Sequence, residues 1–130
     1  MKFIRLVTPT SDANRLTTIL AEASGFVYYV SVLGITGTKS AAANSISDAY
    51  QRIREQTDLP IVTGFGIRTP QQAVEAADLT DGAVVGSAVV EIIANNLTDQ
   101  PAPGVNHDIV EKVATFVGEL ATTIHNRGIG

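Results

Sequence analysis

Residues 59–72 read LPIVTGFGIRTPQQ, and this stretch decides the fold. A short apolar run at residues 59–62 is typical of a buried strand, and it stops at the GFG of residues 64–66. Residues 69–72, TPQQ, then combine a threonine cap, a proline suited to the first helical position and a glutamine that completes a capping box. The stretch therefore predicts a strand, a glycine turn and a helix in direct succession.

The same alternation of short apolar runs and helical patterns continues through the chain. The predicted strands cover residues 3–7, 26–32, 59–65 and 82–90. The predicted helices run from a Ser11 cap to Gly25, around residues 46–53, from residue 70, over a short turn at 91–97 and from residue 106 onward. With no hairpin signal between strands, the order predicts a parallel α/β sheet with right-handed crossovers. The apolar strand at residues 26–32 is expected to be buried on both faces.

Composition excludes several classes of function. The chain has 130 residues, 45% hydrophobic and 17% charged, with 9 basic against 13 acidic residues and no cysteine. No basic cluster suits a nucleic-acid groove, no apolar run reaches the ~18 residues of a membrane span, and thiolate metal sites are excluded. We expect one cytoplasmic domain spanning residues 1–130, without nucleic-acid or membrane partners and without a cofactor or metal.

Glycines follow three successive strands. Residues 34–37 read GITG, residues 64–66 read GFG, and Gly86-Ser87 lies within the fourth apolar run. Because the carboxyl ends of parallel strands meet at one edge, these turns are expected to lie together. Glycine leaves backbone N–H groups accessible, and a helix N-terminus beside them favours an anion. The pattern predicts a phosphate-binding cup built mainly from backbone, the alternative being that each glycine only shapes a turn.

Other candidate residues carry less chemistry. Tyr28 and Tyr29 lie on opposite faces of one strand, so one is expected to pack against helices and the other to present its hydroxyl on the inner face. The alternative is that both tyrosines only pack in the core. His107 and His125 have no partner at metal-ligand spacing and are expected to be surface or capping residues. Motifs for serine hydrolases, metalloproteases and P-loops are absent.

Four segments in this order resemble the tryptophan synthase alpha subunit family: FIRLVTPTS, GFVYYVSVLGITG, LPIVTGFGIRTPQQ and DGAVVGSAVVEII. The resemblance spans almost the whole chain. It implies a (βα)8 TIM barrel that cleaves indole-3-glycerol phosphate, a lyase reaction of tryptophan biosynthesis that yields indole and glyceraldehyde 3-phosphate. By this resemblance the chain corresponds to the last four βα units, a (βα)4 half-barrel.

The resemblance also implies roles for individual residues. Its phosphate site falls on positions that agree with the glycine cup: Gly37, Phe65, Gly66, Gly86 and Ser87. Its substrate pocket falls on Tyr28, which corresponds to a tyrosine beside the indole, on Gly64, and on Thr36 in the loop that closes over the site. The ligand implied is a phosphate-bearing small molecule: indole-3-glycerol phosphate, glyceraldehyde 3-phosphate or inorganic phosphate.

The family's catalytic pair has no counterpart in this sequence. That pair is a glutamate on an early strand and an aspartate in an SDPxADGP-like motif, and no such motif occurs among the 130 residues. Carbon–carbon cleavage needs general acid and base groups, so we expect no catalytic residues and no activity from this chain by itself. The family's contact surface for its beta subunit is also built mainly by the half that is absent here.

Four parallel strands do not close a barrel, because about eight are needed. We expect a homodimer in which residues 3–7 of one copy pair with residues 83–88 of the other. The alternatives are a complementary N-terminal half-barrel, which would make this chain one fragment of a split two-chain lyase, and a flavodoxin-like open sheet that serves as a non-catalytic phosphate-binding or scaffold module.

Overall fold

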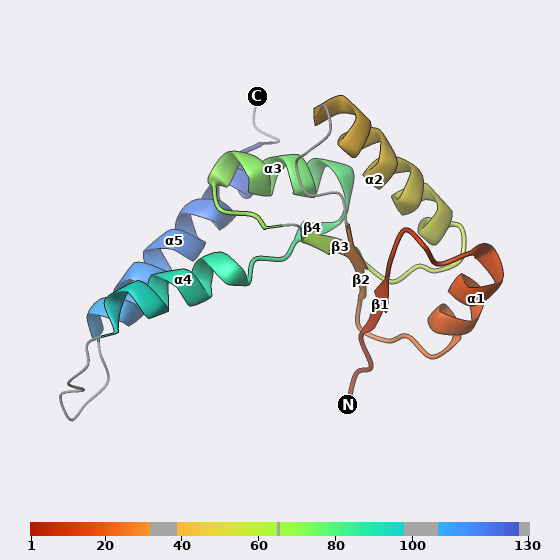
Figure 1. The fold of residues 1–130 in the computed structure, drawn as a ribbon, viewed down its shortest axis with the longest axis horizontal. Helices are drawn as coiled ribbons and strands as arrows, with labels where there is room; N and C mark the ends of the chain where they lie inside the picture. Colours follow the sequence, from red (N-terminus) through yellow and green to blue (C-terminus); the bar gives the residue numbers. More distant parts are fainter. Residues whose placement is uncertain (32–38, 65, 98–106, 128–130) are drawn as a thin grey trace. The chain divides into compact units, whose positions relative to one another are not determined.

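The computed structural model describes residues 1–31, 39–64, 66–97 and 107–127, with only the backbone at 39–42 (Figure 1). The described residues form two compact units. The first comprises Met1–Phe65 with Glu75–Val84, and the second comprises Gly66–Val74 with Val85–Gly130. Whether residues 1–130 act as a single domain, as the sequence predicts, stays a prediction.

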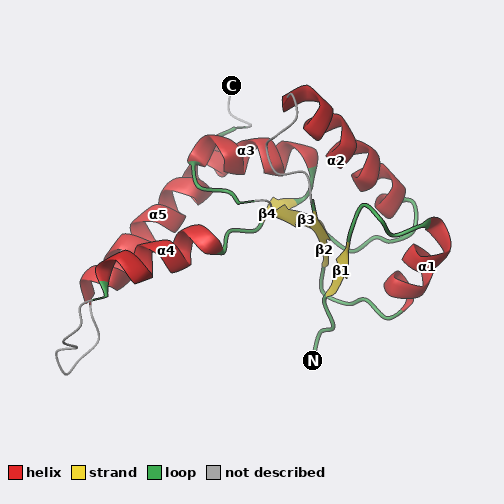
Figure 2. Ribbon diagram, viewed as in Figure 1, coloured by secondary structure: helices red, strands yellow, loops and turns green. Residues whose placement is uncertain are grey.

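The first unit contains a four-stranded parallel sheet (Figure 2). Its strands are β1 (Arg5–Val7), β2 (Val27–Val30), β3 (Ile61–Gly64) and β4 (Gly82–Ala83). The order across the sheet is β1-β2-β3-β4, so each strand lies beside the next one in the sequence. The predicted parallel α/β fold is confirmed. A flavodoxin-like sheet begins with order 2-1-3, so the sequential order excludes that alternative and agrees with part of a TIM barrel.

One face of the sheet carries the core of this unit. Buried strand side chains pack with buried residues of α1 (Ala13–Ala21) and α2 (Lys39–Arg54) in one cluster. The cluster comprises Val7, Leu16, Leu20, Val27, Tyr29, Ile46, Ala49, Ile53 and Ile61. Its large aliphatic members stabilise the fold by about 1.5–3 kcal/mol each when fully buried. Both helices therefore cover the same face, as βα units do in a barrel.

The opposite face of the sheet is open in this chain. Leu6 on β1 is 59% exposed, and the next strand side chains on this face, Tyr28 and Val62, are only partly buried. The expectation that β2 is buried on both faces is therefore wrong. Its burial alternates along the strand, because α1 and α2 pack against one face of the sheet.

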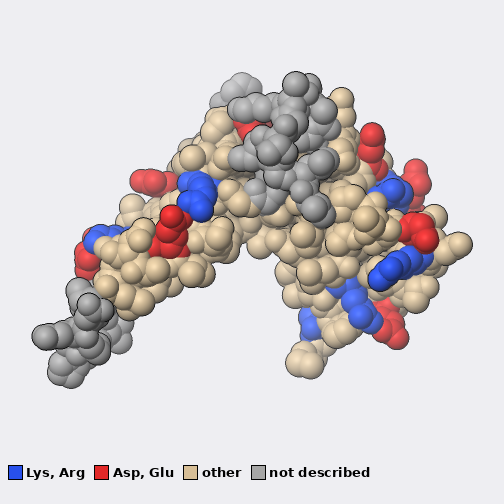
Figure 3. Space-filling model, in the orientation of Figure 1, with Lys and Arg blue, Asp and Glu red and all other residues tan. Residues whose placement is uncertain are grey.

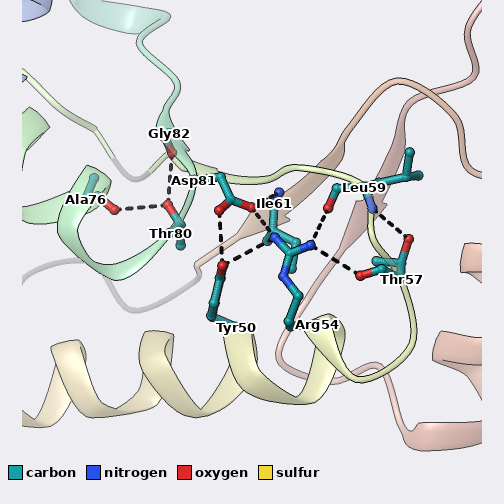
Figure 4. Close-up of polar contacts among 9 residues, drawn as sticks. All are labelled: Tyr50, Arg54, Thr57, Leu59, Ile61, Ala76, Thr80, Asp81 and Gly82. Atoms are coloured by element: carbon teal, nitrogen blue, oxygen red, sulfur yellow. Dashed lines mark hydrogen bonds and ion pairs between the residues drawn. The ribbon is translucent and has the colours of Figure 1, made fainter. Parts of the chain in front are cut away.

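A polar cluster joins the loops that precede β3 and β4 (Figure 4). The Asp81 carboxylate accepts hydrogen bonds from the Tyr50 hydroxyl at 3.0 Å and from the Ile61 N–H at 2.7 Å, and it pairs with Arg54. The Arg54 guanidinium also donates to the carbonyl oxygens of Thr57 and Leu59, at 3.3 and 3.2 Å. The cluster lies at the amino ends of the strands, the end that serves stability in parallel barrels.

The start of α1 differs from the prediction by one residue. Asp12, not Ser11, is the N-cap, and its carboxylate accepts from the Arg15 N–H at 2.8 Å. Ser11 is buried instead, and its N–H donates to the Thr8 carbonyl oxygen at 3.0 Å. Gly25 has the predicted positive φ, at 90°, but it follows the helix end by several residues and does not cap it. Aspartate and serine are both good caps, so propensity could not separate them.

The second unit is helical. It contains the first turn of α3 (Pro70–Leu79), together with α4 (Ser87–Asn96) and α5 (His107–Asn126), which run side by side in Figure 1. Lys112 links α4 and α5 by donating to the Asn96 side-chain oxygen at 2.6 Å. The long last helix is confirmed, and residues 98–106 before it lie outside the described residues.

The fourth apolar run divides differently from the prediction. Residues 82–90 were predicted as one strand, but β4 ends at Ala83 and α4 already begins at Ser87. The helical turn predicted at 91–97 is the later part of α4. A run of small and apolar residues fits a strand and a buried helix equally well, which is why the pattern did not show the change.

Candidate functional site

Gly64 ends β3 at a place with no room for a side chain. A Cβ atom there would lie 2.7 Å from the Val84 carbonyl oxygen and 2.8 Å from the Tyr28 hydroxyl. Both neighbours come from adjacent strands or their ends, because β3 lies between β2 and β4. The absence of a side chain at Gly64 thus lets the Tyr28 hydroxyl and the chain after β4 approach the carboxyl end of β3.

Gly66 is glycine for a different reason. Its φ is +70°, a conformation that side chains disfavour, and no described atom lies within 4 Å of the Cβ position. The backbone after it is fixed to α3 by the predicted capping box. The N–H groups of Arg68 and Thr69 donate to the Gln72 side-chain oxygen at 2.8 and 3.2 Å, and the Gln72 N–H donates to the Thr69 hydroxyl at 3.3 Å. The turn is therefore held while the space at Gly66 stays open.

Gly86 is the N-cap of α4, and Ser87 is the first helical residue. The first bonds of the helix run from the N–H groups of Val89 and Val90 to the Gly86 carbonyl oxygen, at 3.0 and 3.1 Å. The preceding amides belong to the orphan donors of a helix N-terminus, where the helix dipole favours negative charge. No described atom lies within 4 Å of the Cβ position of Gly86, so this terminus is open to a small anion.

An ion pair joins the regions that follow these two turns within the second unit. The Arg68 guanidinium, two residues after Gly66, pairs with the Glu91 carboxylate, four residues after Ser87. Both side chains are about half exposed, at 57% and 48%. No local sequence pattern indicates this pair, because its two residues are 23 positions apart.

The predicted site residues fall into three sets. Tyr28 and Gly64 lie together in the first unit, and Gly66, Gly86 and Ser87 belong to the second. Gly37, Phe65 and Thr36 lie outside the described residues. The expected division of the two tyrosines is confirmed: Tyr29 is 2% exposed within the helix-covered core, and the Tyr28 hydroxyl lies at Gly64 on the other face. Their roles in binding stay predictions.

An open hollow of about 500 Å³ lies beside α2 in the first unit. Polar residues one turn apart on the helix, Asn44, Asp48 and Arg52, line it together with Tyr29. Burial raises the pKa of the Tyr29 phenol, and the nearby positive charge of Arg52 opposes that rise. The hollow holds no predicted site residue, although the four-residue spacing of these polar side chains could have indicated a polar helix face.

Charges are mixed over the face shown in Figure 3, where basic and acidic side chains lie near one another. Within the described ranges, no three His, Asp or Glu side chains group as they would around a metal ion. None of the described helices is both long and apolar enough to cross a membrane. The open glycine turns are thus the chemical feature that the described residues present most clearly.

Comparison with known proteins identifies the family of this chain. A family model described as tryptophan synthase alpha chain matches residues 1–125. The chain belongs to this family. The sequential strand order agrees with part of the barrel of the tryptophan synthase alpha chain family, and the resemblance drawn from the four quoted segments is confirmed.

The fold of this chain matches part of several solved structures of the family. The tryptophan synthase alpha subunit of Campylobacter jejuni is 32% identical with a TM-score of 0.73, over 92% of this chain and 44% of that one. The subunit from Legionella pneumophila str. Paris is 27% identical with a TM-score of 0.74, over 97% and 43%. Tryptophan synthase from M. tuberculosis in an aminoacrylate-bound form is 27% identical with a TM-score of 0.68, over 95% and 40%. This chain therefore spans less than half the length of the family structures it matches.

Proposed function

We propose that this chain supplies the phosphate-binding part of an indole-3-glycerol phosphate lyase site. The observation that carries the proposal is the pair of open turns in the second unit. Gly66 has positive φ, Gly86 caps α4, and both leave free space at the backbone. Backbone N–H groups in such turns bind phosphate oxygens, and a helix N-terminus adds a favourable dipole. The Ser87 hydroxyl would add a side-chain donor.

Family membership supports roles for the remaining pocket residues. Tyr28, whose hydroxyl lies beside Gly64, would line the indole side of the pocket. Gly37 and Phe65 would complete the phosphate site, and Thr36 would belong to the loop that closes over it. In this arrangement the chain binds and orients the glycerol phosphate end of the substrate and contacts the indole ring.

Binding of phosphate is the direct test. Titration with inorganic phosphate, followed by backbone amide NMR shifts, should move the amides of Gly66, Gly86 and Ser87 most. Gly86→Val should abolish these shifts, because its side chain would fill open space at a negative φ of −124°. This variant is a cleaner probe than Gly66→Val, which would also strain a backbone at φ +70°. Gly118→Val on α5 is the control for a general effect, and shifts centred away from the turns would contradict the proposal.

Catalysis is expected to need residues that this sequence does not contain. Cleavage requires one group to protonate the indole carbon and another to take a proton from the ring nitrogen. We therefore expect purified chain to release no indole from indole-3-glycerol phosphate above background. Adding an N-terminal half-barrel of the family, which carries the glutamate and aspartate, tests for a split enzyme by the same indole assay. Turnover by this chain alone, purified free of host enzyme, would contradict the proposal.

We also infer that a second copy of this chain covers the open face of the sheet. The exposed apolar side chains Phe3, Ile4 and Leu6 gather on β1 and the residues leading into it, at 50%, 41% and 59% exposure. Among the described strands, β1 pairs only with β2 and β4 only with β3, so both sheet edges can accept a strand. Two copies related by a two-fold axis would join these edges and supply eight strands. The contact at β4 would involve residues 82–84, since the predicted edge strand at 83–88 is wrong beyond Ala83.

A further inference from the structure

The ion pair between Arg68 and Glu91 links residues that follow the two open turns of the second unit. Exposed ion pairs of this kind contribute little to stability. The position of the pair is more informative than its strength. Arg68 follows Gly66 by two residues, and Glu91 is on the second turn of the helix that Gly86 caps.

Glu91 places a negative charge near the proposed anion site. Side chains on an α-helix lean toward its N-terminus, so we expect the side chain of Glu91, one turn after Ser87, to lean toward the first turn of α4. At a distance of about 10 Å in a water-like medium, one unit charge changes the affinity for an anion by about twofold per negative charge on that anion. An unpaired Glu91 would therefore oppose phosphate binding at Gly86 and Ser87.

Arg68 is held in a position to cancel this charge. Ile67, the residue before it, is 2% exposed, and the Arg68 N–H donates to the Gln72 side-chain oxygen at 2.8 Å. The guanidinium thus extends from an anchored backbone and reaches Glu91, with which it forms an ion pair. The pair joins the loop after β3 to α4 and is electrically neutral.

We propose that Arg68 is a positioning residue that neutralises Glu91, so that the turns at Gly66 and Gly86 can bind a phosphate group. The inference rests on the proposed phosphate-binding function and adds how affinity at that site is set. Arg68 acts through Glu91 and need not touch the phosphate. The two charges should therefore change affinity in opposite directions when each is removed alone.

The experiment measures the dissociation constant of inorganic phosphate for the full chain at low ionic strength, from the amide shift of Ser87. Arg68→Gln should raise the constant about two- to fourfold, and Glu91→Gln should lower it about twofold. The double variant Arg68→Gln/Glu91→Gln should return within about 1.5-fold of the unmodified chain, and all differences should shrink at about 0.5 M salt. Arg68→Lys should keep most of the affinity, because it keeps the charge.

The matched control is the Lys112–Asp108 pair on α5, which has the same charges and contacts α4 at its far end through Asn96. Lys112→Gln and Asp108→Asn should leave the constant unchanged. Equal weakening by Arg68→Gln and Glu91→Gln would mean that the pair only tethers the turns, and it would overturn the inference, as would no change in either variant. If the unmodified chain shows no shift at Ser87, the proposed function itself fails and the inference fails with it.

Discussion

Gly64 and Gly66 stand two positions apart, yet the chain needs glycine at each for a different reason. Gly66 has the left-handed conformation and open space that a phosphate turn requires. Gly64 has neither positive φ nor open space, because a side chain there would clash with the Val84 carbonyl oxygen and the Tyr28 hydroxyl. The GFG pattern predicts backbone exposed to a ligand, which fits Gly66. The demand at Gly64 comes from residues 20 or more positions away, which no local pattern can show.

Gly64→Ala is expected to lower the free energy of unfolding by about 1–3 kcal/mol. The new methyl group would meet the Val84 carbonyl oxygen at 2.7 Å, and backbone cannot turn aside as a side chain can. Adding Tyr28→Phe should recover only part of the loss, because it removes the hydroxyl and leaves the carbonyl. Urea unfolding measures the difference. Gly86→Ala, at an open position, should change stability by less than about 0.5 kcal/mol, and equal losses at the two glycines would contradict this account.

Asp81→Ala is expected to destabilise the first unit by about 1.5–3 kcal/mol. The carboxylate accepts from the Ile61 N–H and the Tyr50 hydroxyl and pairs with Arg54, so its loss leaves three donors without this acceptor. Glu22→Ala is the matched control, because Glu22 pairs with Arg5 but is 74% exposed. Its cost should stay below about 1 kcal/mol. Thermal unfolding of both variants measures the two losses of stability. Equal losses would mean that charge pairing in general, and not the hydrogen-bond network of Asp81, stabilises the fold.

Tyr29 gives the first unit a dependence on alkaline pH. Its pKa is raised above the ordinary value of 10.0, chiefly by burial, so the folded state favours the neutral phenol. This contribution is complete below about pH 10 and is lost as pH rises through the raised pKa, because the unfolded chain ionises first. Tyr29→Phe should therefore lose less stability than the unmodified chain as the pH rises above about 10. Parallel stability curves for the two proteins would show that Tyr29 ionisation is not coupled to folding.

At the scale of elements, the sequence predicted type and order better than boundaries. Strands and helices alternate as expected because apolar runs and helical spacing are strong local signals. The prediction of one strand over residues 82–90 was wrong because Val84 makes one hydrogen bond to Thr63 and the chain then leaves the sheet. A helix begins at Ser87. Nothing in a string of small apolar residues marks that change. Only the contact with β3 decides where β4 ends.

The last helix offers a test of local propensity. Gly118 lies in the interior of α5, exposed and with no described atom within 4 Å of its Cβ position. Glycine costs a helix about 0.5–1 kcal/mol relative to alanine. Gly118→Ala should therefore stabilise the second unit by about that amount, measured by thermal unfolding followed by circular dichroism. A loss of stability would mean that another part of the assembly packs against α5 at this position.

At the scale of the whole molecule, α1 and α2 cover one face of the sheet, and side chains on the other face are more exposed. The family resemblance predicted four parallel strands of a barrel, and the strand order confirms them. The apolar content of β2 did not show which face this chain covers by itself. Tyr28 and Tyr29 are equally apolar in sequence, and only the position of α1 and α2 on one side buries one of them fully.

If a second copy covers the open face, a charge placed there should separate the copies. Light scattering of the unmodified chain at micromolar concentration should then give a mass near twice the 13.7 kDa of one chain. Leu6→Lys should return the mass to that of one chain without unfolding it, because Leu6 is already 59% exposed in the single copy and its loss removes little core. Leu97→Lys is the control, since Leu97 is as exposed, at 66%, but lies at the end of α4 and not on the sheet. It should leave the two-chain mass unchanged.

A one-chain mass for the unmodified protein would rule out the two-fold barrel. A drop to the one-chain mass in both variants would mean that the copies associate through apolar surface in general. The unmodified chain could instead be monomeric and form an equimolar complex with an N-terminal half-barrel, and Leu6→Lys could disrupt that complex. In that case the open face binds a different chain. The same two sheet edges and the same apolar side chains would then be covered by strands that this sequence does not encode.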